Sequence, residues 1–442
     1  MSYNNQVFNK SEEMQLISNQ ILIFPCNGHG TPAVTQTITC LGIAHPEIKI
    51  TSISTNCDSG GATGNHILIM KQLVSKYPGF LCNAVGDYMK LTISLLKHNI
   101  TKHSSTDDIR VARWEDIIEP KLFGCNSRSS DSQVIFGQIR FFVDSFDFRS
   151  NIETYLHTIG GMSGLVVFVN DYCQAYWELR QSNSLVDSST RGEPVWFYIL
   201  YDYLYNQSGR SSDLINKLWL DCEFFYPNYT NKPYGNQAHT IQYNTLTGRT
   251  LIDENQIDNR ERHLELDMSS GVILDSKNHA RIQPDTQIGK LVRDCDTLII
   301  PLGSYETTYL YLKLHLKDII GKQTVILLVN SNIPDNHRGE YQFLLNLLDS
   351  CNLSELILMG AKQSFLGLDL PANSQVEFIH QLEDNKLDTA QLNTAILEHL
   401  KERSVITPTE LTRSIETKLI QARLTHLVPV IVGQVKVKET QF

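Results

Sequence analysis

The sequence predicts an α/β fold with a doubly wound, mostly parallel sheet. Short apolar runs alternate with segments of helical periodicity near the start of the chain, and the alternation returns from about residue 286. Strands that alternate with helices pair in parallel, because each helix carries the chain back to the same end of the sheet. Glycine-bearing loops follow several of the apolar runs. In such sheets, ligands bind where those loops gather, at the carboxyl ends of the strands.

The first elements follow from apolar spacing. Alternating or continuous apolar residues predict strands at 21–25 and 48–55. Helical spacing predicts helices at 33–41, 65–76 and 87–97. The polar stretch 98–132 predicts long loops or an insertion.

Mostly helical patterns occupy residues 150–225, including 195–205 and 212–220. The apolar run 165–169 fits either a buried strand or part of a helix, because a short apolar run has no distinctive period.

The later α/β rhythm is regular. It predicts strands at 297–301, 324–330 and 355–359. It predicts helices at 286–293, 306–317 and 341–350. Two more helices are expected in the tail, and the second opens with a capping box that begins at Thr407. Residues 426–437 have strand character.

These elements suggest a loose arm, one main domain and an extension. We assign residues 1–19 to the arm and 20–360 to the main α/β domain, within which 98–225 form a loop and helical insertion. Residues 361–442 form a C-terminal extension of helices plus a last strand.

Composition narrows the classes of partner. The formal net charge of −10 disfavours a nucleic acid held by phosphate neutralisation. The beginning of the chain does not resemble a signal peptide, and no apolar stretch approaches the roughly 18 residues of a membrane span. The nine cysteines are scattered singly, which is typical of reduced thiols. We expect a soluble cytoplasmic protein with no membrane partner; a homo-oligomer is compatible with these features.

The first loop of interest lies between the strand at 21–25 and the helix at 33–41. It contains Gly28, His29, Gly30 and Thr31. Its glycines let backbone approach a ligand, and the free N–H groups of a helix N-terminus suit phosphate. A plain strand-to-helix turn explains the loop equally well.

The second loop ends the next strand and carries three glycines in five residues. Its candidate residues are Asp58, Ser59, Gly60, Gly61 and Gly64. Asp58 is suited to bind Mg²⁺ carried by a polyphosphate, or to orient a reacting hydroxyl group. The alternative is an N-cap or Asx-turn aspartate.

Two further loops place a glycine before a helix. In the third, Gly86 precedes Asp87, which either caps the helix or faces Asp58 across a shared metal site. In the fourth, Gly303, Ser304 and Thr307 follow the strand at 297–301. A simple Ser304 N-cap is the alternative there.

In this order, the four loops resemble the family that unites 2-phospho-L-lactate transferase with the YvcK-type gluconeogenesis factors. The resembling segments are Gly28–Pro32, Cys57–Gly64, Val85–Asp87 and Pro301–Thr308, with a further segment at Gly248–Ile257. His29 and Pro32 stand where the family has glycines, and Tyr88-Met89 replaces its usual Arg-Asn pair.

The resemblance implies a Rossmann-like domain with an inserted helical portion. Transferase members move a phospholactyl group from a guanosine diphosphate conjugate to a deazaflavin alcohol, releasing GMP, with Mg²⁺. Regulatory members bind a UDP-sugar. Carried over by position, Asp58 and Asp87 become metal or hydroxyl-orienting groups, and the glycine loops contact nucleotide or phosphate.

Two functions follow as hypotheses. The first is a metal-assisted transferase acting on a nucleotide diphosphate conjugate, favoured because both aspartates are present. The alternative is a non-catalytic regulator that binds a UDP-sugar or another nucleotide, favoured by the divergence after Asp87 and by the long tail.

Overall fold

The computed structural model describes the parts of the chain that form the central sheet and most of its surroundings. The described residues are 20–27, 48–57, 61–77, 87–88, 91, 161–185, 203, 228–235, 237–258, 260–261, 264–301, 303–322, 324–329, 333, 337–380 and 388–401. Several predicted segments lie outside them: 1–19, 33–41, 98–132, 212–220, most of 87–97 and 195–205, and everything after residue 401.

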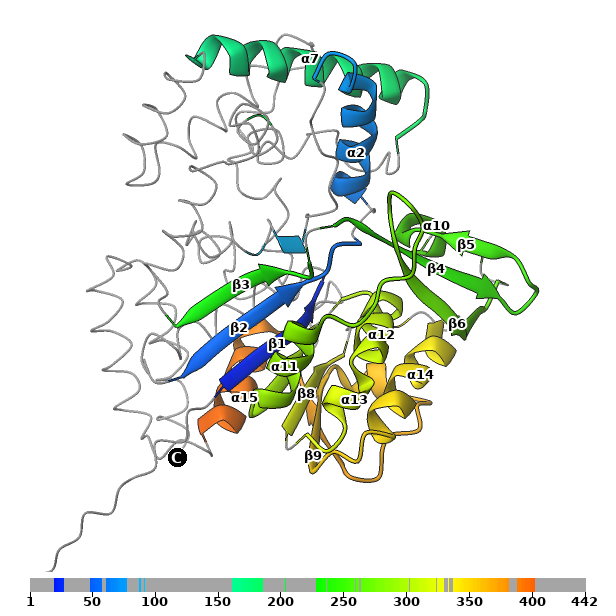
Figure 1. Cartoon of the computed structure of the whole chain (residues 1–442). Coiled ribbons are helices and arrows are strands. Elements are labelled where there is room, and N and C mark those ends of the chain that lie inside the picture. The colour runs from blue at the N-terminus through cyan, green and yellow to red at the C-terminus, as the bar shows by residue number, and fades with distance from the viewer. Residues whose placement is uncertain are drawn as a thin grey trace, which may run out of the picture.

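A seven-stranded sheet forms the centre of the molecule, in the order β10-β9-β8-β7-β1-β2-β3 (Figure 1). Every neighbouring pair in it is parallel. Its strands are β1 Gln20–Cys26, β2 Lys49–Ser54, β3 Tyr229–Pro233, β7 Thr297–Ile300, β8 Thr324–Leu328, β9 Glu355–Gly360 and β10 Ser374–Phe378. The predicted α/β class with a parallel sheet is therefore confirmed.

The direction of winding reverses between β1 and β7. From β1 the chain adds β2 and β3 on one side, whereas β7, β8, β9 and β10 extend from its other side. Such a reversal leaves a crevice at the carboxyl ends of the two strands where it occurs, which is the usual ligand position in open α/β sheets.

Helices cover the sheet on both faces (Figure 1). On one face lie α11 Thr286–Asp294, α12 Tyr305–Leu314, α13 Leu316–Ile319 and α14 Arg338–Asp349. Helix α15 Thr389–Lys401 lies on the opposite face. This burial on both faces explains why the central strands are continuous apolar runs, such as the fully buried β8.

A separate pair of helices, α2 Gly61–Leu73 and α7 Gly161–Gln181, packs together beyond the sheet (Figure 1). The ambiguous run 165–169 belongs to α7 and is therefore helical. His66 Nδ1 of α2 lies 2.7 Å from the Tyr172 hydroxyl of α7, and the two rings stack. This contact holds α2, the helix that begins in the second glycine loop, against α7.

A small antiparallel sheet, absent from the sequence-based prediction, joins β3 to α11. It has the order β5-β4-β6, with β4 His239–Thr245, β5 Thr250–Ile252 and β6 Leu266–Asp275; the short helix α10 Glu254–Asp258 follows β5. The Tyr243 hydroxyl donates to the Glu306 carbonyl at 2.8 Å, which ties this sheet to α12.

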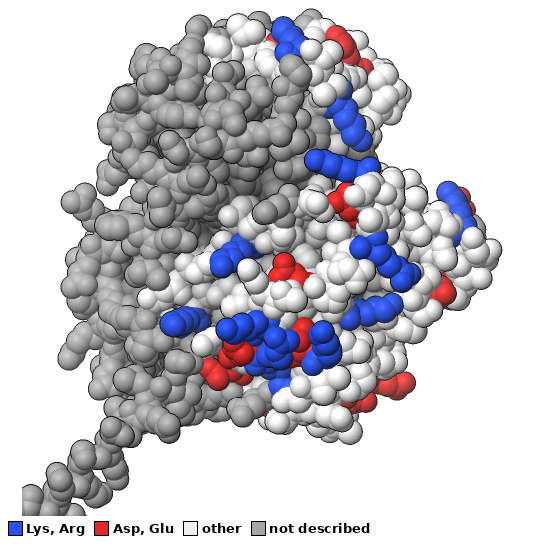
Figure 2. Space-filling model, viewed as in Figure 1, with Lys and Arg blue, Asp and Glu red and all other residues white. Residues whose placement is uncertain are grey.

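Basic and acidic side chains are mixed over the face formed by α11 and α13 (Figure 2). The exposed Arg293 of α11 forms an ion pair with the buried Asp318 of α13. None of the described helices is both long and apolar enough to cross a membrane.

Candidate functional site

The ends of β1 and β7 are packed tightly at the reversal of the sheet. Asn27 directly follows β1, and its Nδ2 donates to Thr308 Oγ1 at 3.2 Å and to the Ser304 carbonyl at 3.4 Å. A Cβ atom on Gly303 would lie 1.4 Å from Asn27 Oδ1 and 2.8 Å from the Asn27 carbonyl oxygen. The residue before the first predicted loop therefore contacts the fourth loop directly, and only glycine fits at position 303.

This close approach gives a direct prediction. Gly303→Ala is expected to lower the free energy of unfolding by about 1–3 kcal/mol, because the new methyl group overlaps Asn27 and forces the two strand ends apart. Urea denaturation measures the change. Gly339→Ala in α14 is the matched control: its Cβ would meet nothing within 4 Å, so the substitution should be neutral or stabilising. Equal midpoints for the two variants would contradict the packing argument.

The end of β2 is a buried run of polar residues. Thr55 Oγ1 donates to Asp87 Oδ2 at 3.0 Å, and Asp87 is only 8% exposed. Cys57 Sγ lies 3.9 Å from Thr307 Oγ1 in the first turn of α12. The start of the second loop thus contacts the third and fourth loops, so the flanks of all four predicted loops lie at one edge of the sheet.

The predicted site residues divide into two groups. Gly303, Ser304, Thr307, Gly64 and Asp87 are described, and Gly61 is the first residue of α2. Outside the described residues lie Gly28, His29, Gly30, Thr31, Asp58, Ser59, Gly60 and Gly86. The contacts above come from residues that immediately flank this second group.

Ser304 is the N-cap of α12. Its Oγ accepts from the Thr307 N–H at 3.4 Å and lies 3.1 Å from Glu306 Oε2, to which it donates. The capping alternative for Ser304 is therefore observed, and the Thr307 N–H already has an acceptor within the helix. An anion near α12 must then use other donors.

Next to this cap lies a buried charge cluster that sequence reasoning did not find. Arg260 donates to Glu306 Oε1 at 3.2 Å, to Glu340 Oε1 at 2.6 Å and to His337 Nδ1 at 2.8 Å. The Arg260 side chain is 1% exposed, and both carboxylates are at most 5% exposed. Arg260 therefore joins the junction before α12 to the junction before α14.

The two carboxylates of this cluster differ in acidity. Burial acts to raise the pKa of Glu306, but the neighbouring His337 and the charge of Arg260 hold that pKa below its ordinary value. Burial raises the pKa of Glu340. The charge of Arg260 offsets only part of this rise, and the neighbouring Glu306 carboxylate adds to it. A single cation cannot fully balance two buried anions, and Glu340 is the one that retains a proton more readily.

Asn56 ties together three segments at the end of β2. Its Nδ2 lies within hydrogen-bond distance of the carbonyl oxygens of Tyr234, Gly235 and Gln237, at 2.9, 3.2 and 3.0 Å. Its carbonyl accepts from the His239 N–H at 2.8 Å. Asn56 is 2% exposed, so these bonds are shielded from water. Its role depends on contacts with residues about 180 positions away in the chain. The spacing of residues around Asn56 in the sequence therefore could not predict this role.

A neutral histidine lies behind the second loop. The Tyr311 hydroxyl accepts from the Asn56 N–H at 3.3 Å, and its oxygen lies 2.7 Å from His239 Nδ1. Burial lowers the pKa of His239 to about 4. The imidazole is thus uncharged near neutral pH, and it orients Tyr311 without supplying positive charge to a phosphate.

The oxygen donors at this edge fit a hard divalent cation. Asp87 supplies a buried carboxylate, and carboxylate oxygens are the ligands that Mg²⁺ prefers. Across the described ranges, however, no three His, Cys, Asp or Glu side chains form a metal-binding group. A metal ion bound at Asp87 would therefore need ligands from outside the described residues, such as Asp58, or from the bound substrate.

The order of strands, the reversal beside β1 and the helices on both faces define a Rossmann-like, doubly wound α/β protein. No family model and no curated protein matches the chain. Among solved structures, two crystal structures of one protein from Bacillus halodurans are similar, and one of them is described as a member of the UPF0052 family. Each has 11% sequence identity and a TM-score of 0.45, and covers 86% of this chain and 99% of its own.

Proposed function

We propose that this protein is a metal-assisted transferase of the 2-phospho-L-lactate transferase type, acting on a nucleotide diphosphate conjugate. The order of the four glycine loops in the sequence supports this function, and so does the meeting of their flanks at one edge of the sheet.

One contact carries the proposal. Thr55 Oγ1 donates to Asp87 Oδ2 at 3.0 Å, which fixes the Asp87 carboxylate at the end of β2. Asp58 follows Thr55 by three residues in the chain. In this proposal the Asp58 carboxylate joins that of Asp87 at the end of β2, although 29 positions separate the two residues in the sequence. Two carboxylates gathered beside one polyphosphate need a cation between them.

Each part of the site then has a role. Backbone N–H groups of the loops around Gly28, Gly30, Gly60 and Gly61 would hold the diphosphate, as is usual for glycine loops that open helices. Asp58 and Asp87 would hold Mg²⁺, which neutralises developing negative charge on the phosphates when bound. A carboxylate not used by the cation would orient the acceptor hydroxyl group and take its proton.

The bond changes are those of group transfer to an alcohol. The acceptor oxygen forms a bond to phosphorus, and the bond between that phosphorus and the bridging oxygen of the diphosphate breaks. A nucleoside monophosphate leaves. The protein contributes mainly position and charge balance, which is what phosphoryl-type transfer requires.

The test is a screen of GTP, GDP, UDP-sugars and lactyl diphosphate conjugates by thermal shift, with and without Mg²⁺, followed by assay for released nucleotide. We expect a Mg²⁺-dependent shift and release of GMP from the guanosine conjugate. Binding of a UDP-sugar without nucleotide release would instead identify the regulatory alternative. No shift with any nucleotide would refute both.

Asp87→Asn tests the metal assignment. We expect turnover to fall at least 100-fold and the Mg²⁺ dependence of binding to disappear, because the amide keeps the shape but loses the charge. Asp58→Asn should behave in the same way. Asp349→Asn, at the exposed end of α14, is the control and should leave turnover unchanged. Wild-type turnover in Asp87→Asn would remove Asp87 from the site.

A further inference from the structure

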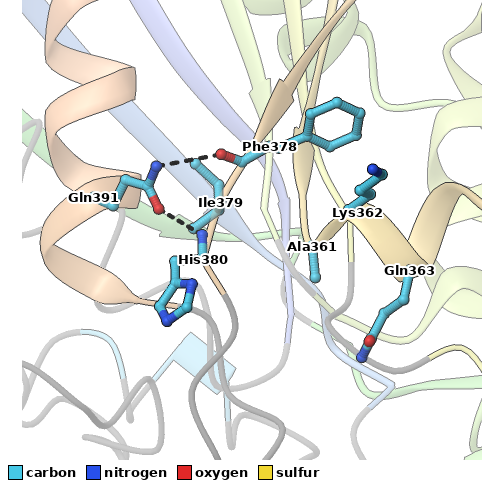
Figure 3. Close-up of a pocket in the computed structure, with 7 residues that line it drawn as sticks. All are labelled: Ala361, Lys362, Gln363, Phe378, Ile379, His380 and Gln391. Atoms are coloured by element: carbon cyan, nitrogen blue, oxygen red, sulfur yellow. Dashed lines mark hydrogen bonds between the residues drawn. The ribbon is translucent and has the colours of Figure 1, made fainter.

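A cavity lies at the carboxyl ends of β9 and β10, away from the reversal of the sheet. Its volume is about 420 Å³, which is within the range of small-molecule sites. Figure 3 shows its lining residues, which come from the turn after β9, the end of β10 and the first turns of α15: Ala361, Lys362, Gln363, Phe378, Ile379, His380 and Gln391.

One wall of the cavity is held in place by hydrogen bonds. Gln391 of α15 accepts from the His380 N–H through Oε1 at 2.5 Å, and its Nε2 donates to the Phe378 carbonyl at 3.3 Å (Figure 3). Both ends of this amide are engaged with backbone, so the wall is formed before any ligand arrives.

The cavity has a positive charge and no lining residue to balance it. None of its seven described lining residues is acidic, and Lys362 forms no ion pair with any described residue. The side chains of Gln363 and His380 also have no hydrogen-bond partner within the described part of the chain. In a protein of net charge −10, an unbalanced ammonium group in a cavity favours an anion.

The rim also offers an apolar surface. The Phe378 side chain is 53% exposed, and its ring meets Phe365 edge-on at 6.0 Å between centroids. In Figure 3 the Lys362 side chain extends on the same side of the cavity as the Phe378 ring, whereas Gln363 and His380 extend on the other side. A flat apolar group can therefore lie against the ring while an anionic group meets Lys362.

We propose that this cavity binds a small organic anion with a planar apolar portion, at a site separate from the nucleotide site. Four strand spacings separate β10 from β1, or about 19 Å at roughly 4.8 Å each. The carboxylate or phosphate group of the ligand pairs with Lys362, its ring packs on Phe378, and a polar substituent reaches His380 or Gln363.

Isothermal titration calorimetry with phenyl phosphate tests the site, with inorganic phosphate as the probe that lacks a ring. We expect saturable binding of phenyl phosphate and weaker binding of inorganic phosphate. Lys362→Gln and Phe378→Ser should each weaken phenyl phosphate at least tenfold. Both residues are exposed, so neither change threatens the fold. Lys290→Gln, at an exposed position of α11, is the charge control and should bind as the wild type does.

The outcomes separate this site from the proposed nucleotide site. Retention of phenyl phosphate binding in Asp87→Asn, together with its loss in Lys362→Gln, supports the proposal even if the transferase assignment fails. Loss of binding in Asp87→Asn would place the probe in the nucleotide site and overturn the proposal. Absence of binding at millimolar concentration, or equal affinity in Lys362→Gln and wild type, would also overturn it.

Discussion

Arg260→Met is expected to lower the free energy of unfolding by about 3–5 kcal/mol at neutral pH, because it leaves two buried carboxylates without their cation. Glu306 and Glu340 both bond to Arg260 and are at most 5% exposed. The variant also removes the bond from Arg260 Nη1 to the Ile257 carbonyl at 2.7 Å, which closes the end of α10. Urea denaturation monitored by circular dichroism measures the loss.

The loss should depend on pH. In the native cluster, the lowered pKa of Glu306 contributes stability above its unfolded pKa, and this is lost as pH falls through the folded value. The raised pKa of Glu340 contributes in the opposite sense: its stability is present below the unfolded pKa and is lost as pH rises through the folded value. Without Arg260 both pKa values rise, so the deficit should grow from about pH 4.5 upward and shrink below it.

Two further variants make this result decisive. Arg249→Met is the control, because Arg249 is exposed in the turn between β4 and β5. It should change the free energy of unfolding by less than about 0.5 kcal/mol. Adding Glu340→Gln to Arg260→Met should recover part of the loss, because one uncompensated charge is gone. A deficit that is the same at pH 4 and pH 7, or no recovery in the double variant, would show that the cluster acts through packing alone.

Asn56→Asp is expected to cost about 3 kcal/mol or more, although it changes only one amide into a carboxylate. The three carbonyl oxygens within 3.2 Å of Nδ2 would lose their donor and face a buried negative charge. The turn between β3 and β4 would separate from the end of β2. We expect a lower urea midpoint with partial recovery at acidic pH, where the introduced carboxyl group is protonated and can donate once.

The control for this prediction is Asn278→Asp. Asn278 is exposed, and its Oδ1 accepts from the Ala280 N–H at 2.8 Å, a bond that a carboxylate preserves. It should leave the midpoint unchanged. If Asn56→Asp also left it unchanged, the described network around Asn56 would have no role in stability.

The sequence predicted five of the seven strands of the central sheet, and missed the edge strands β3 and β10, which are only partly buried. The segments 21–25, 297–301, 324–330 and 355–359 became β1, β7, β8 and β9 with small changes at their ends. A continuous apolar run between helices has few other interpretations. Helix α2 began at Gly61 rather than near residue 65, because glycines that suggest a loop are also tolerated in the first turn of a helix.

The small antiparallel sheet was missed for an equally physical reason. In β4, positions 239, 241, 243 and 245 are buried, but they are His, Ile, Tyr and Thr. Two of these four buried residues, His239 and Thr245, are polar. They can be buried because His239 bonds to Tyr311 and Thr245 Oγ1 lies 2.9 Å from Thr247 Oγ1. The apolar alternation that identifies a strand is therefore weak there.

The candidate site shows the same division. A glycine in a loop between a strand and a helix predicts a close approach of the backbone to another group. Gly303 makes such an approach to Asn27. Arg260, Glu340 and Asn56 give no such signal. Each is an ordinary polar residue in the sequence, and the main partners that give it a role lie 46 or more positions away.

The strand order has a consequence for synthesis of the chain. Strand β1 is made first, yet one of its two neighbours is β7, and the Gln20 N–H bonds to Asp296, 276 residues later. At roughly 5–20 residues per second, ribosomes need about 15–55 s to cover that interval. Throughout it, a nascent strand whose residues 21–24 end up fully buried keeps an edge without its native neighbour. Production of this protein should therefore be sensitive to translation speed and to chaperones that act on growing chains.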